Sequence, residues 1–515
     1  MSLLRRGTTL DGYQGLTAYA GDLHNHCGIS YGHGSVEDAF RNARLQLDFA
    51  TVTGHASWHD MPDDPPHVAA YHERGFERLR KSWEHVQDVT ESVHEDGSFV
   101  SFLSFEWHSM TYGDHCVYYR SGRGPLAPAR ASGLEELRAT LRGLGERGLP
   151  SIMLPHHIGY RRGSRGINWS TYTAELSPVI ELLSMHGCGE DDRSPRPYLH
   201  TMGPRDAGST ALTGLAAGHR FGFIGSTDHH SGHPGSYGYG RAMVWAEELT
   251  REALWEAITS RRTYCVTGDR IMLATSLDGR PMGSTVAAPG SRSLDVAVQG
   301  GSAVDYVEVV RNGEVIARER PGGGHGHAFS GVVPLGFGWG EVGVPVTWDV
   351  ELEVVGGRID AVEPRLRGYD VVAPSDHEPE SFSFSHWSRP ERDRVVLHTR
   401  TDGNPTVMTD ATQRFALHVT GDTSTKVVAR VNGLEVAHSV GDLLEGPRVG
   451  FLGGFVSGAY VFDRAEPRAA LDLEWSVEDT GSGAEEDWYY VRVRQYNDQY
   501  AWSSPIWATR AGTKG

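Results

Sequence analysis

His24 and His26 have the residue type and the spacing of a metal chelate. They follow an apolar run at residues 16–20 that predicts a strand. Because alternate residues of a strand point to the same side, the two imidazoles face one way and can share a cation. Asp22 lies on that side as well, and we expect its carboxylate to hold one imidazole in the tautomer that binds metal. A single His-x-His pair also fits an ordinary polar strand end, so the rest of the chain must decide.

Histidines and carboxylates recur at the ends of predicted strands in the first half of the chain. Of the 26 histidines, 19 precede residue 234. The candidate metal ligands at strand ends are His24, His26, His33, His55, Glu106, His115, His156 or His157, Asp228 and His230. This mixture of imidazoles and carboxylates suits Zn, Mn or Fe better than Ca or Mg. It also exceeds what one tetrahedral zinc requires, so we expect two or three divalent ions, with Glu106 bridging two of them.

A centre of this type supports hydrolysis. Two or more ions can activate a bridging hydroxide as the nucleophile and neutralise the charge that develops on phosphoryl or carbonyl oxygens. The sequence contains no phosphate-binding P-loop, no GxSxG nucleophile elbow and no dinucleotide fingerprint. We therefore predict a metal-dependent hydrolase that acts on a phosphoester of a small anionic molecule. The same centre could instead cleave amides or other carbonyl compounds, or support lyase or iron-dependent oxidative chemistry.

Further residues are candidates for handling the substrate. His186 and His229 could protonate the leaving group, while Asp22 supports the centre from behind its ligands. The arginines of a glycine-containing loop that follows the strand ending at His156 could clamp an anion, as guanidinium forks do. These arginines are Arg161, Arg162 and Arg165. The alternative for them is a solvated basic loop.

An alternation of strands and helices must position these residues. Predicted strands cover residues 16–20, 49–53, 99–105, 115–119, 151–154, 179–183, 221–225 and 263–266. Predicted helices cover residues 35–46, 68–95, 134–144, 210–219 and 251–260. The alternation favours parallel strands with helical crossovers, hence an α/β barrel or a doubly wound sheet. Binding and catalytic sites in such folds lie at the carboxyl ends of strands, and the candidate metal ligands occur at those ends here.

The second half of the chain has a different pattern. From about residue 272 the helical periodicity fades and short alternating runs replace it. Asn312-Gly313 and Asn432-Gly433 are hairpin signals between some of these runs. We expect residues 1–280 to form the hydrolase domain and residues 281–515 to form an all-β, sandwich-like domain. The tryptophans of the second domain could bind carbohydrate or a protein partner, or could form the core of the sandwich.

Charge and cysteine content limit the partners and the compartment. The chain has 515 residues and a formal net charge of -18 at pH 7. This charge argues against nucleic acid or an anionic membrane as a partner, because both require a basic face. The four cysteines form no CxxC pair, so a reducing compartment is expected. No signal peptide or membrane span is indicated, and we expect a cytoplasmic protein whose oligomeric state stays open.

The candidate ligands also form an ordered series of motifs. The motifs are Asp22-Leu23-His24-Asn25-His26, Val52-Thr53-Gly54-His55, Phe105-Glu106, His115, Pro155-His156 and Ser226-Thr227-Asp228-His229-His230. In order and spacing they resemble the PHP (polymerase and histidinol phosphatase) family over residues 17–270. The resemblance implies a distorted (β/α)7 barrel, a trinuclear Zn, Mn or Fe centre and phosphoester hydrolysis. Two departures are that Gly54 stands where the family usually has Asp, and that His156 and His157 compete for one position.

The resemblance further implies how the ligands are shared among the ions. The first ion would take His24, His26, Glu106 and Asp228, the second would share Glu106 and add His115 and His156, and the third would take His33, His55 and His230. The whole chain resembles a long bacterial branch of PHP-like proteins named only as a domain of unknown function. Residues 261–268 and a β-rich tail containing residues 489–494 and 502–507 are typical of that branch.

Overall fold

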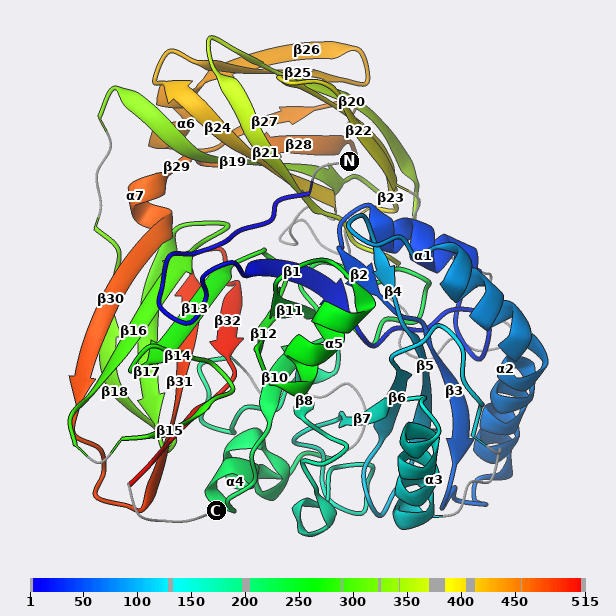
Figure 1. The fold of residues 1–515 in the computed structure, drawn as a ribbon. Helices are drawn as coiled ribbons and strands as arrows, with labels where there is room; N and C mark the ends of the chain where they lie inside the picture. Colours follow the sequence, from blue (N-terminus) through cyan, green and yellow to red (C-terminus); the bar gives the residue numbers. More distant parts are fainter. Residues whose placement is uncertain are drawn as a thin grey trace.

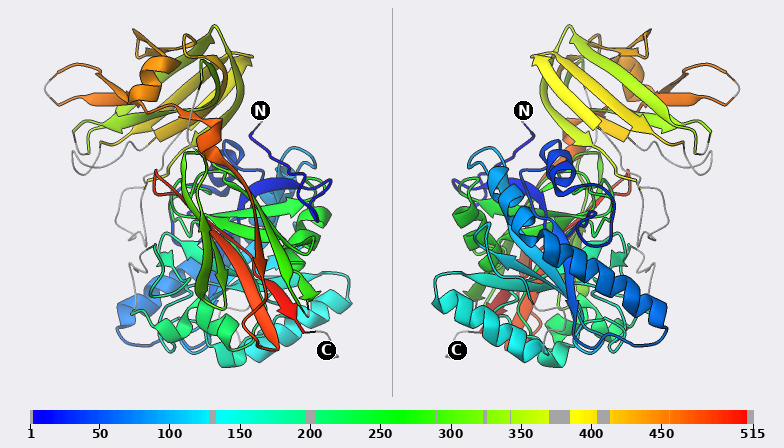
Figure 2. Two further views of the ribbon diagram at one scale, coloured as in Figure 1. Left: turned by 90° about the vertical axis from the view of Figure 1, so that its left-hand side faces the viewer. Right: turned by 90° about the vertical axis from the view of Figure 1, so that its right-hand side faces the viewer.

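The computed structural model describes residues 3–127, 133–196, 204–288, 290–322, 326–341, 343–369, 385–403, 413–454 and 456–510 (Figure 1). It is a mixed α/β structure with a large β-rich part, as predicted. The helices α1 (Val36–Arg44), α2 (Pro66–Ser92) and α3 (Leu134–Glu146) cover one side of the molecule, and the last strands of the chain lie on the opposite side (Figure 1). A two-sheet β-rich unit projects from one end (Figure 2).

β1 (Thr17–Asp22) leads into the first histidine pair and is an inner strand of the largest sheet. It pairs in parallel with β2 (Phe49–Ala50), which pairs in parallel with β4 (Val100–Ser101). On its other side β1 pairs antiparallel with β11 (Arg241–Ala246), and β11 continues to β12 (Thr263–Val266). The histidine pair therefore leaves a strand that is hydrogen-bonded on both edges, which limits its movement.

A second sheet contains β3 (Thr53–Trp58), β5 (Leu103–His108), β6 (His115–Tyr119) and β7 (Ser151–Pro155). β3 and β5 are parallel, but β6 runs antiparallel to both β5 and β7. The prediction of parallel strands throughout is thus wrong here. The reason is that residues 109–114 join β5 to β6, and a parallel crossover needs a dozen or more residues.

A third, small sheet completes the surroundings of the histidine-rich loops. In it, β8 (Val179–Ser184) pairs in parallel with β10 (Gly222–Gly225) and antiparallel with β9 (Gly187–Cys188). The predicted strand at residues 49–53 is divided between β2 and β3, which belong to different sheets. Within the part of the chain that the structure describes, strand pairing leaves the three sheets open and does not close them into a (β/α)7 barrel.

The helices lie where the sequence predicts them. Ser35 caps α1 as expected, because its hydroxyl oxygen accepts a hydrogen bond from the Asp38 N–H over 3.1 Å. α2 buries Phe76, Leu79 and Trp83. The other helices before residue 280 are α4 (Ala211–Ala216) and α5 (Arg251–Thr259), with 3-10 turns η1 (Trp169–Thr171) and η2 (Ala207–Ser209).

The β-rich part contains further sheets. A four-stranded sheet has the order β14 (Arg280–Pro281), β13 (Met272–Leu277), β16 (Arg292–Gln299) and β30 (Asp472–Asp479). One larger sheet has the order β21 (Arg358–Arg365), β24 (Gln413–Asp422), β19 (Ala328–Trp339), β28 (Gly458–Phe462) and β27 (Arg448–Phe451), with β29 (Glu466–Pro467) beside β19. The other has the order β22 (Ser385–Glu391), β23 (Arg394–Thr401), β20 (Val346–Val355), β25 (Lys426–Val431) and β26 (Leu434–Ser439). The last two sheets share one apolar core, and α6 (Val440–Glu445) and α7 (Arg468–Leu471) border them.

The predicted hairpins form at both Asn-Gly pairs. β17 (Val304–Arg311) and β18 (Glu314–Glu319) are joined through Asn312 and Gly313, and both turn residues have positive φ. The second pair, at residues 432–433, joins β25 to β26 in the same way. Positive φ at two successive residues is the geometry of the tight turn that these pairs favour.

The end of the chain returns to the sheet that contains β1. β31 (Glu486–Gln495), β32 (Tyr500–Ser503), β33 (Ile506–Thr509), β15 (Thr285–Ala287) and β17 extend that sheet beyond β12. β32 pairs directly with β12, and buried residues from both halves of the chain share one core. The division at residue 280 stays a prediction, and strands from its two sides are hydrogen-bonded to each other. Among the described residues, no helix is both long and apolar enough to cross a membrane.

Candidate metal centre

The loops after β1 and β10 bring three of the predicted ligands together. His24 Nε2 lies 3.1 Å from His26 Nε2 and 3.3 Å from Asp228 Oδ1. His26 Nε2 lies 3.0 Å from the same oxygen, and all three side chains are buried. The Asp228 N–H donates to His24 O and the His26 N–H donates to His229 O, both over 2.7 Å. The two loops are therefore fastened to each other by their backbones, which fixes the distance between the ligands.

Asp22 supports the backbones of these loops. Its carboxylate accepts hydrogen bonds from the N–H groups of His24 (3.1 Å), Thr227 (3.1 Å) and Gly235 (2.8 Å), and from the Thr227 hydroxyl (2.5 Å). We expected Asp22 to hold an imidazole, but the imidazole partner is Glu181 on β8. His24 Nδ1 donates to Glu181 Oε2 over 2.8 Å, which leaves Nε2 to face the other ligands.

Glu106 is the carboxylate at the middle of the cluster. Its Oε2 lies 2.6 Å from His55 Nδ1 and 3.7 Å from His26 Nε2, and its Oε1 lies 2.7 Å from His156 Nε2. The residue is 1% exposed. Burial alone would raise the pKa of this carboxyl, but His108, His55 and His156 hold the pKa well below its ordinary value. A buried negative charge among imidazoles is the environment in which a carboxylate can be shared by two cations.

His108 belongs to this cluster although the sequence analysis missed it. It follows Glu106 by two residues on β5, so the two side chains project to the same face. Its Nε2 lies 3.1 Å from His55 Nδ1, and its Nδ1 lies 3.1 Å from Asp114 Oδ2 and 2.8 Å from Arg165 Nη2. A carboxylate that orients an imidazole in this way is typical of metal ligands. The i, i+2 argument that we applied to His24 would have identified His108 as well.

Three imidazoles form a second group beside Glu106. The rings of His26 and His55 are stacked with centroids 3.9 Å apart, and the His230 ring lies 4.3 Å from that of His26. His230 Nδ1 donates to the Asp228 carbonyl over 2.9 Å, and Tyr31 stacks on His55 at 3.6 Å. Burial lowers the pKa of both His55 and His230 well below the ordinary value. These rings are therefore neutral, which is the form that binds metal.

The pairing register of β6 determines which of its residues faces the cluster. Cys116 is directly opposite Glu106 on β5, whereas His115 is opposite Trp107. Residues directly opposite in an antiparallel pair project to the same face, so Cys116 faces the cluster and His115 faces away. The His115 ring lies 5.9 Å from the Trp107 ring, and its Nδ1 donates to the Gly113 carbonyl over 2.9 Å. The structure thus does not bring the predicted ligand His115 to the other ligands.

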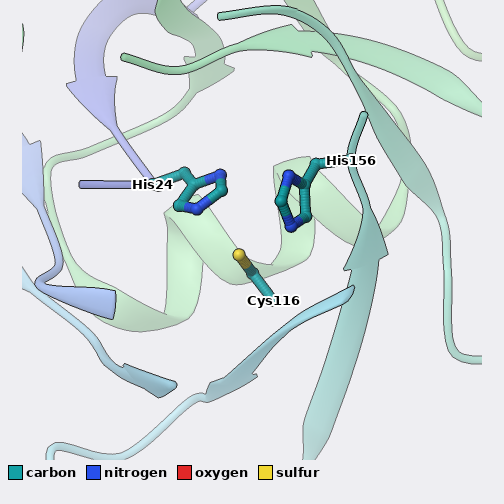
Figure 3. A group of neighbouring side chains, drawn as sticks. All are labelled: His24, Cys116 and His156. Carbon is teal, nitrogen blue, oxygen red and sulfur yellow. The ribbon is translucent and has the colours of Figure 1, made fainter. Parts of the chain in front are cut away.

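Cys116 lies instead in a buried group with His24 and His156 (Figure 3). The ligand atoms of these three residues are within 4.8 Å of one another. The centroids of the two imidazole rings are 4.3 Å apart, and the rings are nearly perpendicular. Burial raises the pKa of the Cys116 thiol to about 12, so the sulfur keeps its proton when no cation is near.

His186 and His229, the two candidate proton donors, lie on different sides of Asp228. His186 Nε2 is 3.0 Å from Asp228 Oδ2, so this imidazole borders the cluster. The His229 ring lies 6.0 Å from the ring of Tyr239 and 6.3 Å from that of His233. His229 therefore points away from the cluster.

His33 and the pair His156–His157 are the remaining predicted ligands. The His33 N–H donates to His230 O over 2.8 Å, but its side chain belongs to none of the ligand groups found in the described ranges. His156 contacts Glu106 directly, whereas His157 lies 3.7 Å from Asp114 and has a positive φ of 55°. Of the two neighbours, His156 is the one in contact with the central carboxylate.

The predicted anion-binding arginines divide into two kinds. Arg161 and Arg162 are exposed. Arg165 binds Asp114 through Nε at 2.6 Å and through Nη2 at 2.5 Å. Burial alone would lower the pKa of Arg165, but Asp114 raises it. Arg165 thus holds Asp114 in place beside His108. The two exposed arginines, Arg161 and Arg162, are the ones that can bind an anion from solvent.

The donor set fits divalent cations. His26 Nδ1, His55 Nε2 and His156 Nδ1 are buried, and none has a hydrogen-bond partner within the described part of the chain. Burial alone would lower the pKa of His24, but Asp228 raises it well above the ordinary value. The carboxylate thus stabilises positive charge at this imidazole. Imidazole nitrogens combined with carboxylate oxygens favour Zn, Mn or Fe over Ca or Mg.

A family model matches a short part of the chain. Residues 236–275 match the model described as "Protein of unknown function (DUF3604)". This agrees with the predicted likeness to a branch named only as a domain of unknown function. The matched segment contains β11, α5 and β12 and none of the clustered ligands.

Curated relatives match about a third of the chain. An "Uncharacterized protein" of Chlamydia muridarum is 27% identical over 175 residues, which are 31% of this chain and 28% of that protein. The corresponding Chlamydia pneumoniae protein is 28% identical over 188 residues, or 33% of this chain and 30% of that protein. The match covers less than a third of the length of these relatives.

A solved structure resembles the chain at low similarity. It is a two-domain protein from Bacteroides vulgatus, described as containing a predicted PHP-like metal-dependent phosphoesterase. The two chains are 12% identical, and the match covers 85% of this chain and all of the other at a TM-score of 0.33. A similarity of this size says nothing about activity, so the argument for function rests on the geometry of the ligands.

Proposed function

We propose that this protein is a metal-dependent hydrolase with a buried centre for two or three divalent ions and a small anionic phosphoester as its substrate. The main support is the position of Glu106, which contacts His55 on one side and His156 on the other. Asp228 and the first histidine pair form an adjacent group. One carboxylate between two sets of imidazoles suits ions that share a ligand, as in centres that hydrolyse phosphoesters.

In this proposal the ions are held by side chains on β3 and β5 and by side chains that follow β1, β7 and β10. These are His24, His26, His55, Glu106, His108, His156, Asp228 and His230, with His33 as a further candidate from the sequence. The three sheets around them would correspond to a distorted PHP-type barrel. Bound divalent ions would offset the negative charge of the phosphoryl oxygens and lower the pKa of a bound water.

The remaining side chains would position the reactants and move protons. His186 lies 3.0 Å from Asp228, at the border of the ligand cluster, and would donate a proton from Nε2 to the leaving oxygen. Arg161 and Arg162, exposed on the loop beyond β7, would attract the anionic substrate. Asp22 would keep the two ligand loops at a fixed separation through its four hydrogen bonds.

The test combines metal analysis with a substrate screen. The purified protein is analysed by mass spectrometry for Zn, Mn and Fe, and is then assayed on phosphomonoesters, phosphodiesters, amides and lactones. Glu106→Gln should lower phosphoester turnover by at least about 10²–10³-fold, the loss seen when one group that stabilises developing charge is removed. The control is His85→Ala, because His85 is an exposed helix residue paired with Glu37.

Two results would contradict the proposal. Full metal content and full phosphoester turnover in Glu106→Gln would exclude a role for the central carboxylate. Activity on amides or lactones alone, unaffected by substitution of Arg161 and Arg162, would assign the centre to carbonyl substrates, because neutral carbonyl compounds need no cationic side chain for capture.

A further inference from the structure

Strand β6 presents a thiol, and not an imidazole, to the ligand cluster. Its neighbours on both sides fix this orientation: Cys116 is opposite Glu106 on β5 and opposite Leu154 on β7. A shift of one residue in register would exchange Cys116 for His115, but such a shift would have to break both pairings. Cys116 is 1% exposed, so its orientation is also fixed by packing.

Two imidazoles lie beside Cys116, and each offers a ring nitrogen as a ligand atom. His24 uses Nδ1 to donate to Glu181, which leaves Nε2 as the atom that faces the cluster. His156 is 1% exposed, and its Nδ1 has no hydrogen-bond partner within the described residues. Figure 3 shows the sulfur beside the two imidazole rings, with the three side chains coming from three separate segments. Two imidazoles and a sulfur within 4.8 Å of one another make a site for a cation with a preference for nitrogen and sulfur.

We propose that Cys116 is a thiolate ligand to an ion of this centre, at the edge where His24 and His156 meet. The inference rests on the proposed metal centre and makes it specific. When the metal–sulfur bond forms, the S–H bond breaks and its proton passes to solvent, so the ion gains one anionic ligand. Thiolate is a soft ligand, and it favours Zn or Fe over Mn and Mg.

Cobalt substitution tests the thiolate directly. The metal-free full-length protein is titrated with Co²⁺, and the near-ultraviolet absorption that arises from thiolate-to-cobalt charge transfer is recorded. We expect this band in the wild type, its loss in Cys116→Ala, and its retention in Cys265→Ala. Cys265 is the matched control because it is equally buried and lies outside every ligand group of the described residues. A band that survives in Cys116→Ala, or is absent from the wild type, would overturn the proposal.

X-ray absorption of the zinc-loaded wild type gives an answer without any variant. A sulfur scatterer at about 2.3 Å from Zn is expected, against about 2.0–2.1 Å for imidazole nitrogen. A shell of nitrogen and oxygen alone would refute the proposal even if Cys116→Ala failed to fold. A thiolate signal in a protein with no phosphoester turnover would retain Cys116 as a ligand and reject the proposed activity. Phosphoester turnover with no thiolate signal would reject Cys116 as a ligand and retain the proposed activity.

Metal selectivity provides a second readout. Removing the thiolate should weaken Zn binding by at least about tenfold, the lower limit seen when even an outer partner of a ligand is lost. Mn binding, which depends on oxygen and nitrogen ligands, should change less. Competition between Zn and Mn in the wild type and in Cys116→Ser, followed by metal analysis, measures the ratio. An unchanged ratio would contradict the proposal.

Discussion

At the scale of single residues, the cluster is organised by groups that orient the ligands. Glu181 orients His24 through Nδ1, so that Nε2 faces inward, and Asp114 and Arg165 together hold His108 at its Nδ1. The sequence could not distinguish Glu181 from an ordinary buried carboxylate, because its role depends on a contact between residues 157 positions apart. His108 could have been predicted from the sequence, because its spacing from Glu106 repeats the spacing of the first histidine pair.

Glu181→Gln is the prediction at this scale. The amide keeps the size of the side chain but removes its charge, so His24 loses the carboxylate that raises its basicity as a ligand. We expect the affinity for Zn to fall by about 10–100-fold, with the fold retained. Competition with a chelator of known affinity measures the change. Glu175→Gln serves as the control, because Glu175 pairs with Arg142 on the surface. Equal affinities in the two variants would contradict the role of Glu181.

At the scale of elements, the limits of β6 were predictable and the face that each of its residues presents was not. The sequence predicts a strand at residues 115–119, and β6 has those limits. The face that His115 presents depends on which residue of β5 lies opposite, and a slip of one residue reverses every side chain. The sequence alone does not determine that register. The motif resemblance therefore selected the histidine, whereas the pairing directs its neighbour Cys116 inward.

A comparison of His115→Ala with His108→Ala follows from this register. His115 lies on the face with Trp107, so its loss should leave the metal content unchanged. His108 lies against His55 and is oriented by Asp114, so its loss should remove or weaken one ion. Mass spectrometry of both purified variants counts the ions per chain. The reverse result would mean that β6 pairs with β5 in a different register.

Gly54 in β3 gives a second prediction for an element. The PHP resemblance places Asp at this position, but a Cβ atom on Gly54 would lie 2.6 Å from Leu79 Cδ1 and 3.3 Å from Ile29 Cδ1. Gly54→Asp would thus place a carboxylate between β3 and the apolar face of α2. We expect the free energy of unfolding to fall by about 2 kcal/mol or more, from overpacking and an unpaired buried charge. Urea denaturation measures it.

Gly145→Asp is the control for that measurement. A Cβ atom on Gly145 meets nothing within 4 Å, and this glycine lies in α3. We expect its replacement to change stability by less than about 1 kcal/mol. If Gly54→Asp were equally harmless, or if it strengthened metal binding, the close packing of α2 on β3 would not explain the departure from the family pattern.

At the scale of the whole molecule, the ligand-bearing sheet depends on the end of the chain. Alternating runs and Asn-Gly pairs predicted a β-rich second half, and this is confirmed. Nothing in those patterns indicates that β32 would pair with β12, because partners 235 or more residues apart leave no local signal. Tyr490, Arg492 and Trp502 all bind the buried carboxylate of Glu190, which follows β9.

Truncation is the prediction that belongs to this scale. A chain that ends at residue 484 lacks β31, β32 and β33, so it exposes the edge of β12 and leaves Glu190 without three of its partners. We expect this chain, and residues 1–280 alone, to aggregate or to lack a cooperative unfolding transition.

Trp502→Ala, a milder change in the full chain, should lower the free energy of unfolding by about 3–5 kcal/mol. A chain ending at Arg510 is the control, because it keeps all three strands. If residues 1–280 unfold cooperatively and bind the full number of ions, the first half is an independent domain and the shared sheet is dispensable. If they do not, the last strands of the chain are part of the scaffold that holds the metal ligands.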